Sequence, residues 1–470
     1  MNDRTIHFVS LGCPKNRVDT EVMLGVSERA GCRLVEDPGD AEVIVVNTCG
    51  FIESAKQESI DTILELAEQK AQGRCERLVV AGCLSQRYPE ELARELPEVD
   101  HFLGSSDMLK LDGILRLDHG QLGHRLQVGN PGDYVFRLED PRRLSQAPHS
   151  AYVKIAEGCS RRCSFCAIPS FRGRQRSRPI QDVVAEVDRL VSMGTREINL
   201  ISQDTISYGR DLHPRADLSA LVDALCRVND LRWLRIFYLY PDQLDPTLLA
   251  RLCEDGPVVP YLDMPFQHGS DAMLKRMRRG YHAERQREII AQVRERNPDI
   301  AIRTAFILGH PGETDADFEA ICDLVRFAQF DHLGVFRYSH EEGTHSGTMG
   351  DALVPDEVVE ERYRHLMEIQ QEASRARLQR WVGRELEILI EGESEESDLL
   401  LQGRHRGQAP EIDGVVHLTN GTAQRGDLKR ALITHAGDYD LVGDLSCGRD
   451  NPEYPQGAPR GPARRHLHVF

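Results

Sequence analysis

The sequence lacks any run of about 18 apolar residues, the length that a membrane-spanning helix needs. Residues 1–13 carry neither the basic region nor the long apolar stretch of a signal peptide. Positive charge is also scarce, because 58 Lys and Arg stand against 75 Asp and Glu, a formal net charge of -17. This balance disfavours non-specific binding to nucleic acid, whose backbone attracts Lys and Arg. We expect a soluble, cytoplasmic protein without a membrane partner.

Structural disulfides are not expected either, because a cytosolic compartment keeps thiols reduced. The 12 cysteines should therefore be free thiols or metal ligands. With 40% hydrophobic and 28% charged residues, the composition is that of an ordinary globular protein. A chain of 470 residues suggests about three domains.

The first hundred residues alternate short β-branched runs with helical patterns. This alternation predicts an open, parallel βαβ domain, which we place at residues 4–118. The expected strands are residues 6–9, 43–46 and 78–80, and the expected helices are residues 18–30 and 53–69. The polar residues 119–144, with several Gly and Pro, are predicted to be a linker.

The same α/β alternation resumes in the middle of the chain. Six βα units in residues 145–380 predict a partial (β/α)6 barrel. Strands are expected near residues 153–155, 197–201, 234–237, 261–263, 302–308 and 333–338. A helix rich in Glu and Arg at residues 355–379 ends the pattern.

The pattern changes class after residue 380. Short apolar runs at residues 387–390, 414–418 and 431–434 are separated by Gly and acidic turns. This spacing predicts a small all-β barrel at residues 381–449. Residues 450–470 are rich in Pro and Arg and are predicted to be disordered.

Three cysteines lie close together directly after the first strand of the predicted barrel, at Cys159, Cys163 and Cys166. A structural zinc site would normally use four ligands in two close pairs, and no fourth ligand accompanies this triplet. Three thiolates on one short loop suit a 4Fe-4S cluster in which three irons are held by the protein and the fourth is open.

A second triplet is distributed over the N-terminal domain. Cys13, Cys49 and Cys83 each follow a predicted strand and adjoin a glycine. Because the carboxyl ends of parallel strands share one edge of a sheet, the three thiols should converge and hold another cluster with a free iron. The remaining cysteines show no such grouping and are interpreted as packing or incidental thiols: Cys32, Cys75, Cys226, Cys253, Cys322 and Cys447.

The spacing of the Cys159 triplet, with Phe165 before its last cysteine, resembles the radical S-adenosylmethionine (radical SAM) superfamily. The resemblance implies that the open iron binds the amino and carboxylate groups of SAM. An electron from the cluster would then cleave SAM to a 5′-deoxyadenosyl radical. The protein would hold SAM against the cluster and exclude water.

Two triplets in this order resemble the methylthiotransferases over residues 5–449. Residues 12–16, 161–174 and 261–268 resemble most the branch that modifies an aspartate of a ribosomal protein. The branch that modifies tRNA is expected to carry Gln-Met in place of Pro14-Lys15. Thr20, where Ser is usual, and His310, where an aromatic is usual, depart from the family pattern.

The resemblance implies a cytoplasmic enzyme that inserts a methylthio group at the β-carbon of an aspartate in ribosomal protein S-twelve of the small subunit. Its cofactors would be two 4Fe-4S clusters and SAM, and its electrons would come from a reductant protein. One SAM would methylate a sulfur on the N-terminal cluster, and the other cluster would make the radical. Two alternatives stay open: methylthiolation of an adenosine in tRNA, and a non-catalytic iron-sulfur or zinc adaptor that binds RNA.

Residues at strand ends of the barrel are candidates for SAM contacts. One predicted strand runs into a glycine-rich turn at residues 309–313, and the resemblance places SAM contacts there. Amides after two other strands could orient the methionyl or ribose groups. The candidates are Gln203, Gln267, Arg303, Gly309, Gly312 and Glu313. Asp204 is equally suited to capping a following helix.

Charge patterns add two hypotheses. Arginines around the Cys159 triplet are usually a solvated face, but they could also favour a reduced cluster or bind an anionic substrate. They are Arg161, Arg162, Arg172, Arg174, Arg176 and Arg178. Residues 381–449 resemble a TRAM domain but hold 7 Lys and Arg against 13 Asp and Glu. This acidic balance suits a basic ribosomal protein, with residues 391–398 as a candidate contact or a loop kept for solubility.

Overall fold

The structure is a computed structural model, and it describes residues 4–118, 120–121, 123–394 and 397–446. Its backbone packs into two compact units, Met1–Ala373 and Ser374–Phe470, which are described separately. None of the helices in the described ranges combines the length and the apolar character needed to cross a membrane. The predicted boundaries at residues 118, 144 and 380 remain predictions.

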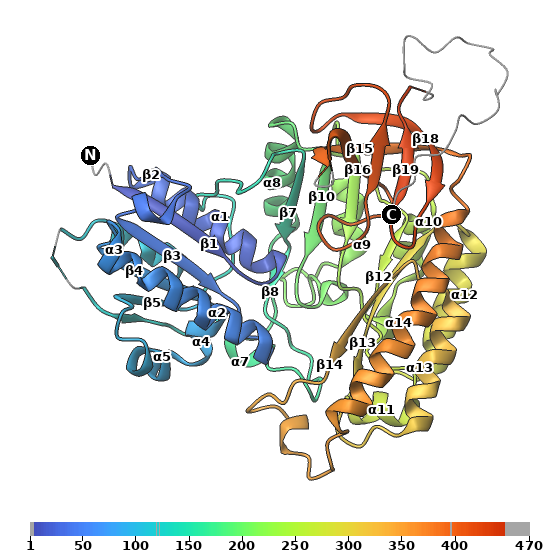
Figure 1. The fold of residues 1–470 in the computed structure, drawn as a ribbon, viewed down its shortest axis with the longest axis horizontal. Helices are drawn as coiled ribbons and strands as arrows, with labels where there is room; N and C mark the ends of the chain where they lie inside the picture. Colours follow the sequence, from blue (N-terminus) through green and yellow to red (C-terminus); the bar gives the residue numbers. More distant parts are fainter. Residues whose placement is uncertain (1–3, 119, 122, 395–396, 447–470) are drawn as a thin grey trace. The chain divides into compact units, whose positions relative to one another are not determined.

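The N-terminal part of the first unit is a six-stranded parallel sheet with the order β2-β1-β3-β4-β5-β6 (Figure 1). The strands are Thr5–Ser10 (β1), Arg33–Leu34 (β2), Val43–Thr48 (β3), Arg77–Gly82 (β4), His101–Leu103 (β5) and Leu126–Gln127 (β6). The helices are Pro14–Arg29 (α1), Glu53–Ala67 (α2), Gln69–Gln72 (α3), Cys83–Arg87 (α4), Pro89–Glu95 (α5) and Leu111–Leu115 (α6), with 3-10 turns at Pro38–Asp40 (η1) and Met108–Lys110 (η2). The three predicted strands and the two predicted helices are confirmed.

Alternation along β3 explains why this sheet needs helices on both faces. Val43 and Val45 pack into one hydrophobic core and Ile44 and Val46 into another, because successive side chains of a strand point to opposite faces. All six residues of β3 are buried, as expected for a parallel strand that is covered on both sides. The predicted linker at residues 119–144 contributes β6, so part of it belongs to the sheet.

The central part of the first unit contains two parallel three-stranded sheets, with the orders β11-β10-β7 and β12-β13-β14. Their strands are Ser150–Lys154 (β7), Glu197–Ile201 (β10), Trp233–Ile236 (β11), Tyr261–Asp263 (β12), Ala301–Leu308 (β13) and His332–Arg337 (β14). A bridge between Leu234 and Val258 links the two sheets. In the described chain β7 and β14 are each paired on one side only, so the barrel is partial. The six predicted barrel strands are confirmed.

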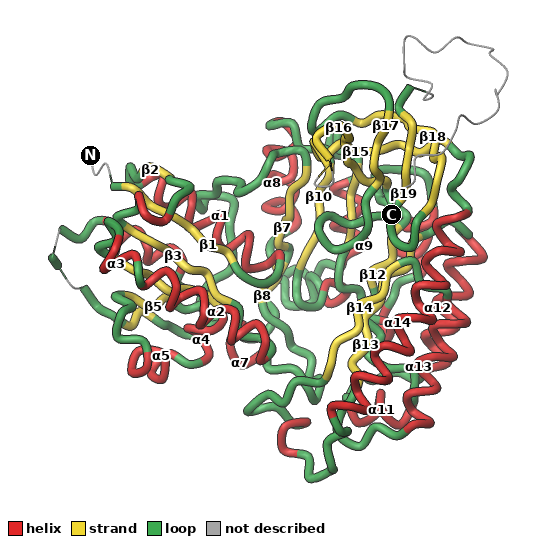
Figure 2. The backbone as a smooth tube through the Cα atoms, viewed as in Figure 1, coloured by secondary structure: helices red, strands yellow, loops and turns green. Residues whose placement is uncertain are grey.

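Helices follow these strands, and Figure 2 draws them in red beside the yellow strands of this region. The helices are Ile168–Arg172 (α7), Ile180–Ser192 (α8), Leu218–Leu225 (α9), Pro246–Cys253 (α10), Asp271–Arg276 (α11), Ala283–Arg296 (α12), Asp315–Ala328 (α13) and Asp356–Gln379 (α14). A short ribbon of Ala156–Glu157 (β8) and Arg176–Ser177 (β9) and three 3-10 turns, Thr205–Ser207 (η3), Pro241–Gln243 (η4) and Ser346–Thr348 (η5), complete the region.

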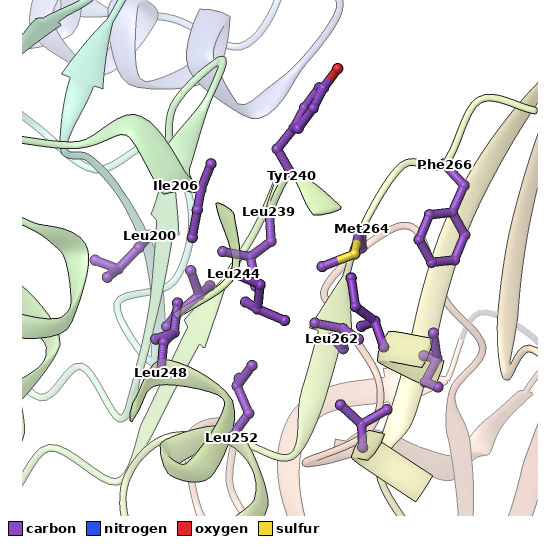
Figure 3. Close-up of a cluster of buried hydrophobic side chains, with 14 of the residues drawn as sticks. Leu200, Ile206, Leu239, Tyr240, Leu244, Leu248, Leu252, Leu262, Met264 and Phe266 are labelled. Carbon is purple, nitrogen blue, oxygen red and sulfur yellow. The ribbon is translucent and has the colours of Figure 1, made fainter. Parts of the chain in front are cut away.

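A single large hydrophobic core holds the partial barrel together. Figure 3 shows part of it, where Leu239 and Leu244 lie between Leu200 on one side and Leu262 on the other. These side chains are at least nine-tenths buried. Burial of this extent stabilises the strands by the removal of apolar surface from water, which leaves the loops at their carboxyl ends free to carry function.

The second unit contains a closed barrel with the strand order β15-β16-β17-β19-β18. Its strands are Glu385–Ser394 (β15), Ser397–His405 (β16), Val416–Thr419 (β17), Leu428–Ala436 (β18) and Leu441–Asp444 (β19). Pairing of β15 with β18 closes the barrel, so it has no free edge. The predicted all-β class is confirmed, although β16 and β19 were not among the predicted strands. Cys447, the acidic residues Glu395 and Glu396, and the predicted disordered tail at residues 450–470 lie outside the described residues.

Candidate functional site

Cys13, Cys49 and Cys83 follow three neighbouring strands that end level with one another. Ser10 of β1 pairs with Asn47 of β3, and Thr48 of β3 pairs with Gly82 of β4. The loops that carry the three thiols therefore start at the same edge of the sheet. This arrangement is the convergence that the sequence predicts.

The position before Cys13 requires glycine for a geometric reason. Gly12 has φ +85°, and a Cβ at this position would lie 2.8 Å from Cβ and 3.1 Å from Sγ of Cys49. Any side chain would be strained there and would collide with the second thiol. Gly12 thus allows Cys13 and Cys49 to approach one another.

The three N-terminal thiols differ in exposure. Cys13 is exposed, Cys49 is half-buried and Cys83 is buried. Burial is the largest of the effects that raise the pKa of Cys83 to about 12; the nearby Cys13 and Cys49 act in the same direction, and Arg172 acts in the opposite one. Burial also raises the pKa of Cys49. Metal binding deprotonates such thiols outright, so the set needs a strong cationic acceptor to become thiolates.

The Cys159 triplet lies on the loop between β8 and α7, and backbone hydrogen bonds hold this loop at both ends. The Cys159 N–H donates to the Gly173 carbonyl over 3.0 Å, and the Ser164 N–H donates to the Met277 carbonyl over 3.1 Å. Gly158 has φ +78°, and a Cβ there would lie 2.4 Å from the Arg174 carbonyl oxygen. The loop shape is therefore fixed by its surroundings.

Two nitrogen donors reach the sulfurs of this loop. The Arg161 N–H donates to Sγ of Cys159 over 3.4 Å, and Nη1 of Arg279 donates to Sγ of Cys163 over 3.3 Å. Burial is the largest of the effects that raise the pKa of Cys159 to about 11 and that of Cys166 to about 12, and the neighbouring Cys163 acts in the same direction on both.

Helix α7 connects the two triplets. It begins two residues after Cys166 and ends at Arg172, whose Nε and Nη2 donate to Sγ of Cys83 over 3.2 and 3.0 Å. Phe171 of the same helix packs against Cys83. The two cysteine sites are therefore parts of one structure within the first unit.

A buried ionic network surrounds Arg172. Arg172 pairs with Asp19 over 2.7 Å and with Glu157 over 3.3 Å, and Lys154 bonds to both of these carboxylates. Burial acts to raise the pKa of Glu157, but Lys154 and Arg172 outweigh burial and lower its pKa to about 2. Buried charges are tolerated when they are paired in this way, and losing one partner is strongly destabilising.

Gln203 lies at the edge of this network, directly after β10. Its Nε2 donates to Glu157 over 2.8 Å, which fixes the amide, whereas Oε1 is buried without a hydrogen-bond partner in the described structure. A buried carbonyl oxygen without a donor is costly, so a ligand donor would be favourable at this place. Asp204 makes no capping bond and instead accepts from Arg161 over 2.7 Å, so the capping alternative is wrong.

The other candidates for SAM contacts lie at or near the same end of the barrel. Gln267 follows β12 and has φ +73°, a strained conformation for a residue other than glycine. Its N–H donates to Ala305 over 2.8 Å and its carbonyl accepts from Ile307 over 2.9 Å, so the backbone is held against β13. Arg303 lies within β13 rather than at its end, with Nε 3.9 Å from a carboxylate oxygen of Asp263.

The turn after β13 is organised by Glu313. Gly309 and Gly312 have φ +76° and +79°, which glycine adopts without strain. The Glu313 carboxylate accepts from the Gly309 N–H over 3.0 Å and pairs with Arg362, and its side chain is fully buried. Glu313 thus shapes the turn through bonds within the protein.

In the described residues, no three His, Cys, Asp or Glu side chains are placed to hold one metal ion together. This finding concerns sites for a single ion, such as zinc, whose ligands converge on one point. In a 4Fe-4S site each thiolate binds a different iron, so the thiolates stand apart. The assignment of the six cysteines as cluster ligands remains a prediction.

Comparisons with known proteins identify the family. Family models match an uncharacterized protein family, UPF0004, at residues 5–104, the radical SAM superfamily at residues 153–325 and the TRAM domain at residues 382–445. The ribosomal protein uS12 methylthiotransferase RimO of Sorangium cellulosum is 56% identical, over 98% of this chain and 94% of that protein. The chain belongs to the RimO family.

A second RimO protein, from Geobacter sulfurreducens, is 48% identical over 94% of this chain and 98% of its own length. Among solved structures, the radical SAM methyltransferase TsrM from Kitasatospora setae is similar, with a TM-score of 0.53 and 16% identity over 73% of this chain and 77% of that chain. This likeness shows the fold alone. The family predicted from the motifs is confirmed, and so is the methylthiotransferase class.

In this member of the RimO family, only part of the arginine stretch is a solvated face: Arg162 and Arg174 are exposed, but three other arginines are paired within the fold. Arg172 and Arg178 are buried, and Arg178 pairs with Asp182 and Glu186. Arg161 is half-buried and stacks on the Tyr240 ring, 3.3 Å from its centroid. The solvated interpretation is wrong for these three, because each guanidinium has carboxylate partners within the fold.

Three site residues of this RimO family member escaped the sequence analysis. Arg279 belongs to no recognised sequence motif, and only the fold brings it to Cys163. Lys15 lies in the motif at residues 12–16 but is not among the predicted site residues. Its Nζ lies 3.1 Å from the centroid of the Tyr238 ring. The Tyr238 ring is presented by a backbone with φ +59°.

Proposed function

We propose that this chain transfers a methylthio group to the β-carbon of an aspartate in ribosomal protein uS12. The observation that carries the proposal is that Arg172, on the helix directly after the Cys159 triplet, bonds to Cys83 of the other triplet. Radical generation and sulfur transfer need two centres close to one substrate, and this arrangement provides two thiol sites in one unit. RimO relatives that match over almost the whole chain support the substrate.

The two thiol sets fit two 4Fe-4S clusters. Each set offers three cysteines, and the glycines beside them leave space for close approach of the backbone. Arg172 and Arg279 donate to one sulfur in each set, which would stabilise anionic thiolates. Two such clusters with SAM would supply the radical that activates an unreactive C–H bond and the sulfur that is added to the carbon.

The residues of the barrel would position SAM and keep water away. The unpartnered Oε1 of Gln203 is suited to accept from the amino group or a ribose hydroxyl of SAM. Gly309 and Gly312 allow the backbone of their turn to approach a ligand. Gln267 would line the same edge, and Arg303 and Glu313 would act through the strand and the turn that they hold.

The partner in this proposal is basic and belongs to the small ribosomal subunit in the cytoplasm. Residues 381–449 carry an excess of acidic residues, which favours a basic protein over a phosphate backbone. Electrons would come from a reductant protein.

The test is methylthio transfer by the anaerobically reconstituted protein. The protein is mixed with recombinant uS12 or with tRNA, SAM and a chemical reductant, and the products are analysed by mass spectrometry. We expect methylthio-aspartate in uS12 and no modified adenosine. Modified tRNA with unmodified uS12 would show that the chain acts on RNA, and SAM cleavage without iron would exclude the radical mechanism.

A further inference from the structure

Lys15 is a buried cation close to the Cys13 triplet. It is 8% exposed and follows Cys13 by two residues, in the first turn of α1. Its Nζ lies over the face of Tyr238, which follows β11 of the barrel. In the described chain, no hydrogen bond or ion pair accompanies this cation–π contact of Nζ.

A buried ammonium without an anion is physically unfavourable. Its removal from water is costly unless an opposite charge compensates it. The first turn of a helix adds to the cost, because the helix dipole is positive there. The contact with the Tyr238 ring compensates only part of the loss. The position therefore favours an anion that comes from outside the chain.

A comparison with Lys154 shows what is missing at Lys15. Lys154 is also buried, but Asp19 and Glu157 both bind its ammonium group. Asp263 acts on Lys15 only at longer range, because its carboxylate accepts from the Tyr238 N–H over 2.8 Å and forms no ion pair with Lys15 in the described chain. The protein thus neutralises one buried lysine and leaves the other with an aromatic face alone.

Lys15 also lies where the N-terminal sheet region meets the barrel. It follows Cys13 of one triplet by two residues, and its Nζ lies over the ring of Tyr238, which follows a barrel strand. Asp263 fixes the strained backbone of Tyr238 and holds its ring beneath the ammonium group. The aromatic face occupies one side of Nζ and leaves N–H donors on its other sides for a ligand.

We propose that Lys15 binds the side-chain carboxylate of the target aspartate, an inference that rests on the proposed function. A carboxylate would give the ammonium group its missing anion and form a charge-assisted hydrogen bond. In aspartate the β-carbon carries the carboxylate directly, so fixing the carboxylate also fixes the β C–H bond. A neutral base such as adenosine offers no such anion, so Lys15 would determine specificity for aspartate.

The alternative is that Lys15 neutralises thiolates at Cys13. Arg172 already donates two hydrogen bonds to the third thiol of that set. The two roles differ in what they require. A carboxylate receptor must distinguish aspartate from asparagine in the substrate. A counter-ion for the cluster would bind both forms of the substrate equally.

The experiment measures binding of uS12 to the anaerobic holoenzyme, with the target aspartate intact or changed to asparagine. The unchanged enzyme should prefer the aspartate form by about tenfold or more. Lys15→Met should remove this preference by weakening binding of the aspartate form, with the asparagine form bound as before. Lys15→Arg should retain part of the preference. Lys275→Met, which removes an exposed lysine on α11, is the matched control.

The outcomes separate the possibilities. Equal weakening of both uS12 forms by Lys15→Met, or lost iron with an unchanged preference, would overturn the role of Lys15 as a carboxylate receptor. If the unchanged enzyme methylthiolates uS12, such a result leaves the proposed function standing. If the unchanged enzyme modifies no uS12 at all, the proposed function fails and this inference fails with it.

Discussion

The Arg172 guanidinium donates to Sγ of Cys83 from Nε and Nη2, across 89 residues of sequence. Arg172 is the last residue of helix α7 in the barrel region, whereas Cys83 is the first residue of helix α4, directly after strand β4 of the N-terminal sheet. The remaining nitrogen of Arg172 pairs with Asp19, so the guanidinium has no freedom to leave the thiol. This buried side chain, together with Phe171, thus connects helix α7 to a thiol of the N-terminal triplet.

The first prediction concerns Arg172→Gln. Hydrogen bonds to cluster sulfurs raise the reduction potential, so their loss should lower the potential of the N-terminal cluster by about 50 mV or more. The other cluster should keep its potential. Redox titration followed by electron paramagnetic resonance measures both, and Arg172→Lys should show a smaller change. Equal shifts in the reduction potentials of both clusters, or no shift in either, would contradict a specific contact between Arg172 and Cys83.

The second prediction assigns the radical site. Changing Cys159, Cys163 and Cys166 together to Ala should leave about half of the iron and abolish formation of 5′-deoxyadenosine, because the cluster that cleaves SAM is lost. Iron analysis and chromatography of the nucleoside products measure both. Cys226→Ala, at a thiol outside both triplets, is the control. An unchanged iron content in the triple variant would contradict the assignment of these three cysteines as cluster ligands.

The third prediction assigns the sulfur site. Changing Cys13, Cys49 and Cys83 together to Ala should preserve reductive cleavage of SAM, because the other triplet remains. It should remove methylthio transfer to uS12, which mass spectrometry detects. Methylthiolated uS12 from this variant would show that the sulfur is handled elsewhere.

The fourth prediction concerns acid sensitivity at His310. Its Nε2 lies 2.8 Å from the Ser346 hydroxyl, and that hydroxyl donates to Ser164 in the Cys159 loop over 2.8 Å. Burial lowers the pKa of His310 from 6.5 to about 4. The unfolded chain therefore binds a proton that the folded chain does not, as the pH falls from about 6.5 to about 4, and stability falls over this window.

The loss from His310 should reach on the order of 1 kcal/mol between pH 7 and pH 5.5. Urea unfolding at several pH values measures it. His310→Asn should reduce this part of the pH dependence, and His345→Gln, at an exposed histidine of a nearby loop, should leave it unchanged. The same slope in all three proteins would show that His310 is not responsible.

The fifth prediction concerns the acidic run of the second unit. Changing Glu393, Glu395 and Glu396 to Lys should weaken uS12 binding and reduce its salt dependence, without affecting SAM cleavage. Single surface pairs contribute only about 0 to 1 kcal/mol, so the three changes must act as a patch. The matched control changes the exposed acids Asp188, Glu284 and Glu295 to Lys. Unchanged binding of uS12 to the variant, or loss of an interaction with tRNA, would contradict the predicted contact between the acidic run and uS12.

The sequence by itself determined the longer parallel strands and the places of the cysteines. Alternating β-branched runs predict β1, β3 and β4, and residues after parallel strands must share an edge, so the approach of Cys13, Cys49 and Cys83 followed from local patterns. The spacing of the Cys159 triplet likewise needs only one loop. Strands β16 and β19 were not predicted, because polar residues interrupt their short apolar runs.

Only the tertiary structure decided which charges meet the sulfurs. In sequence, Arg172 is one of six arginines in a basic stretch, and nothing distinguishes it from the exposed Arg174. In the folded chain, Arg172 is buried between Cys83 and Asp19 and bonds to both. Lys15 and Lys154 are both buried, but only Lys154 has a carboxylate partner. Electrostatic interactions depend on distance and on exclusion of water, and for residues far apart in the chain both are fixed by folding alone.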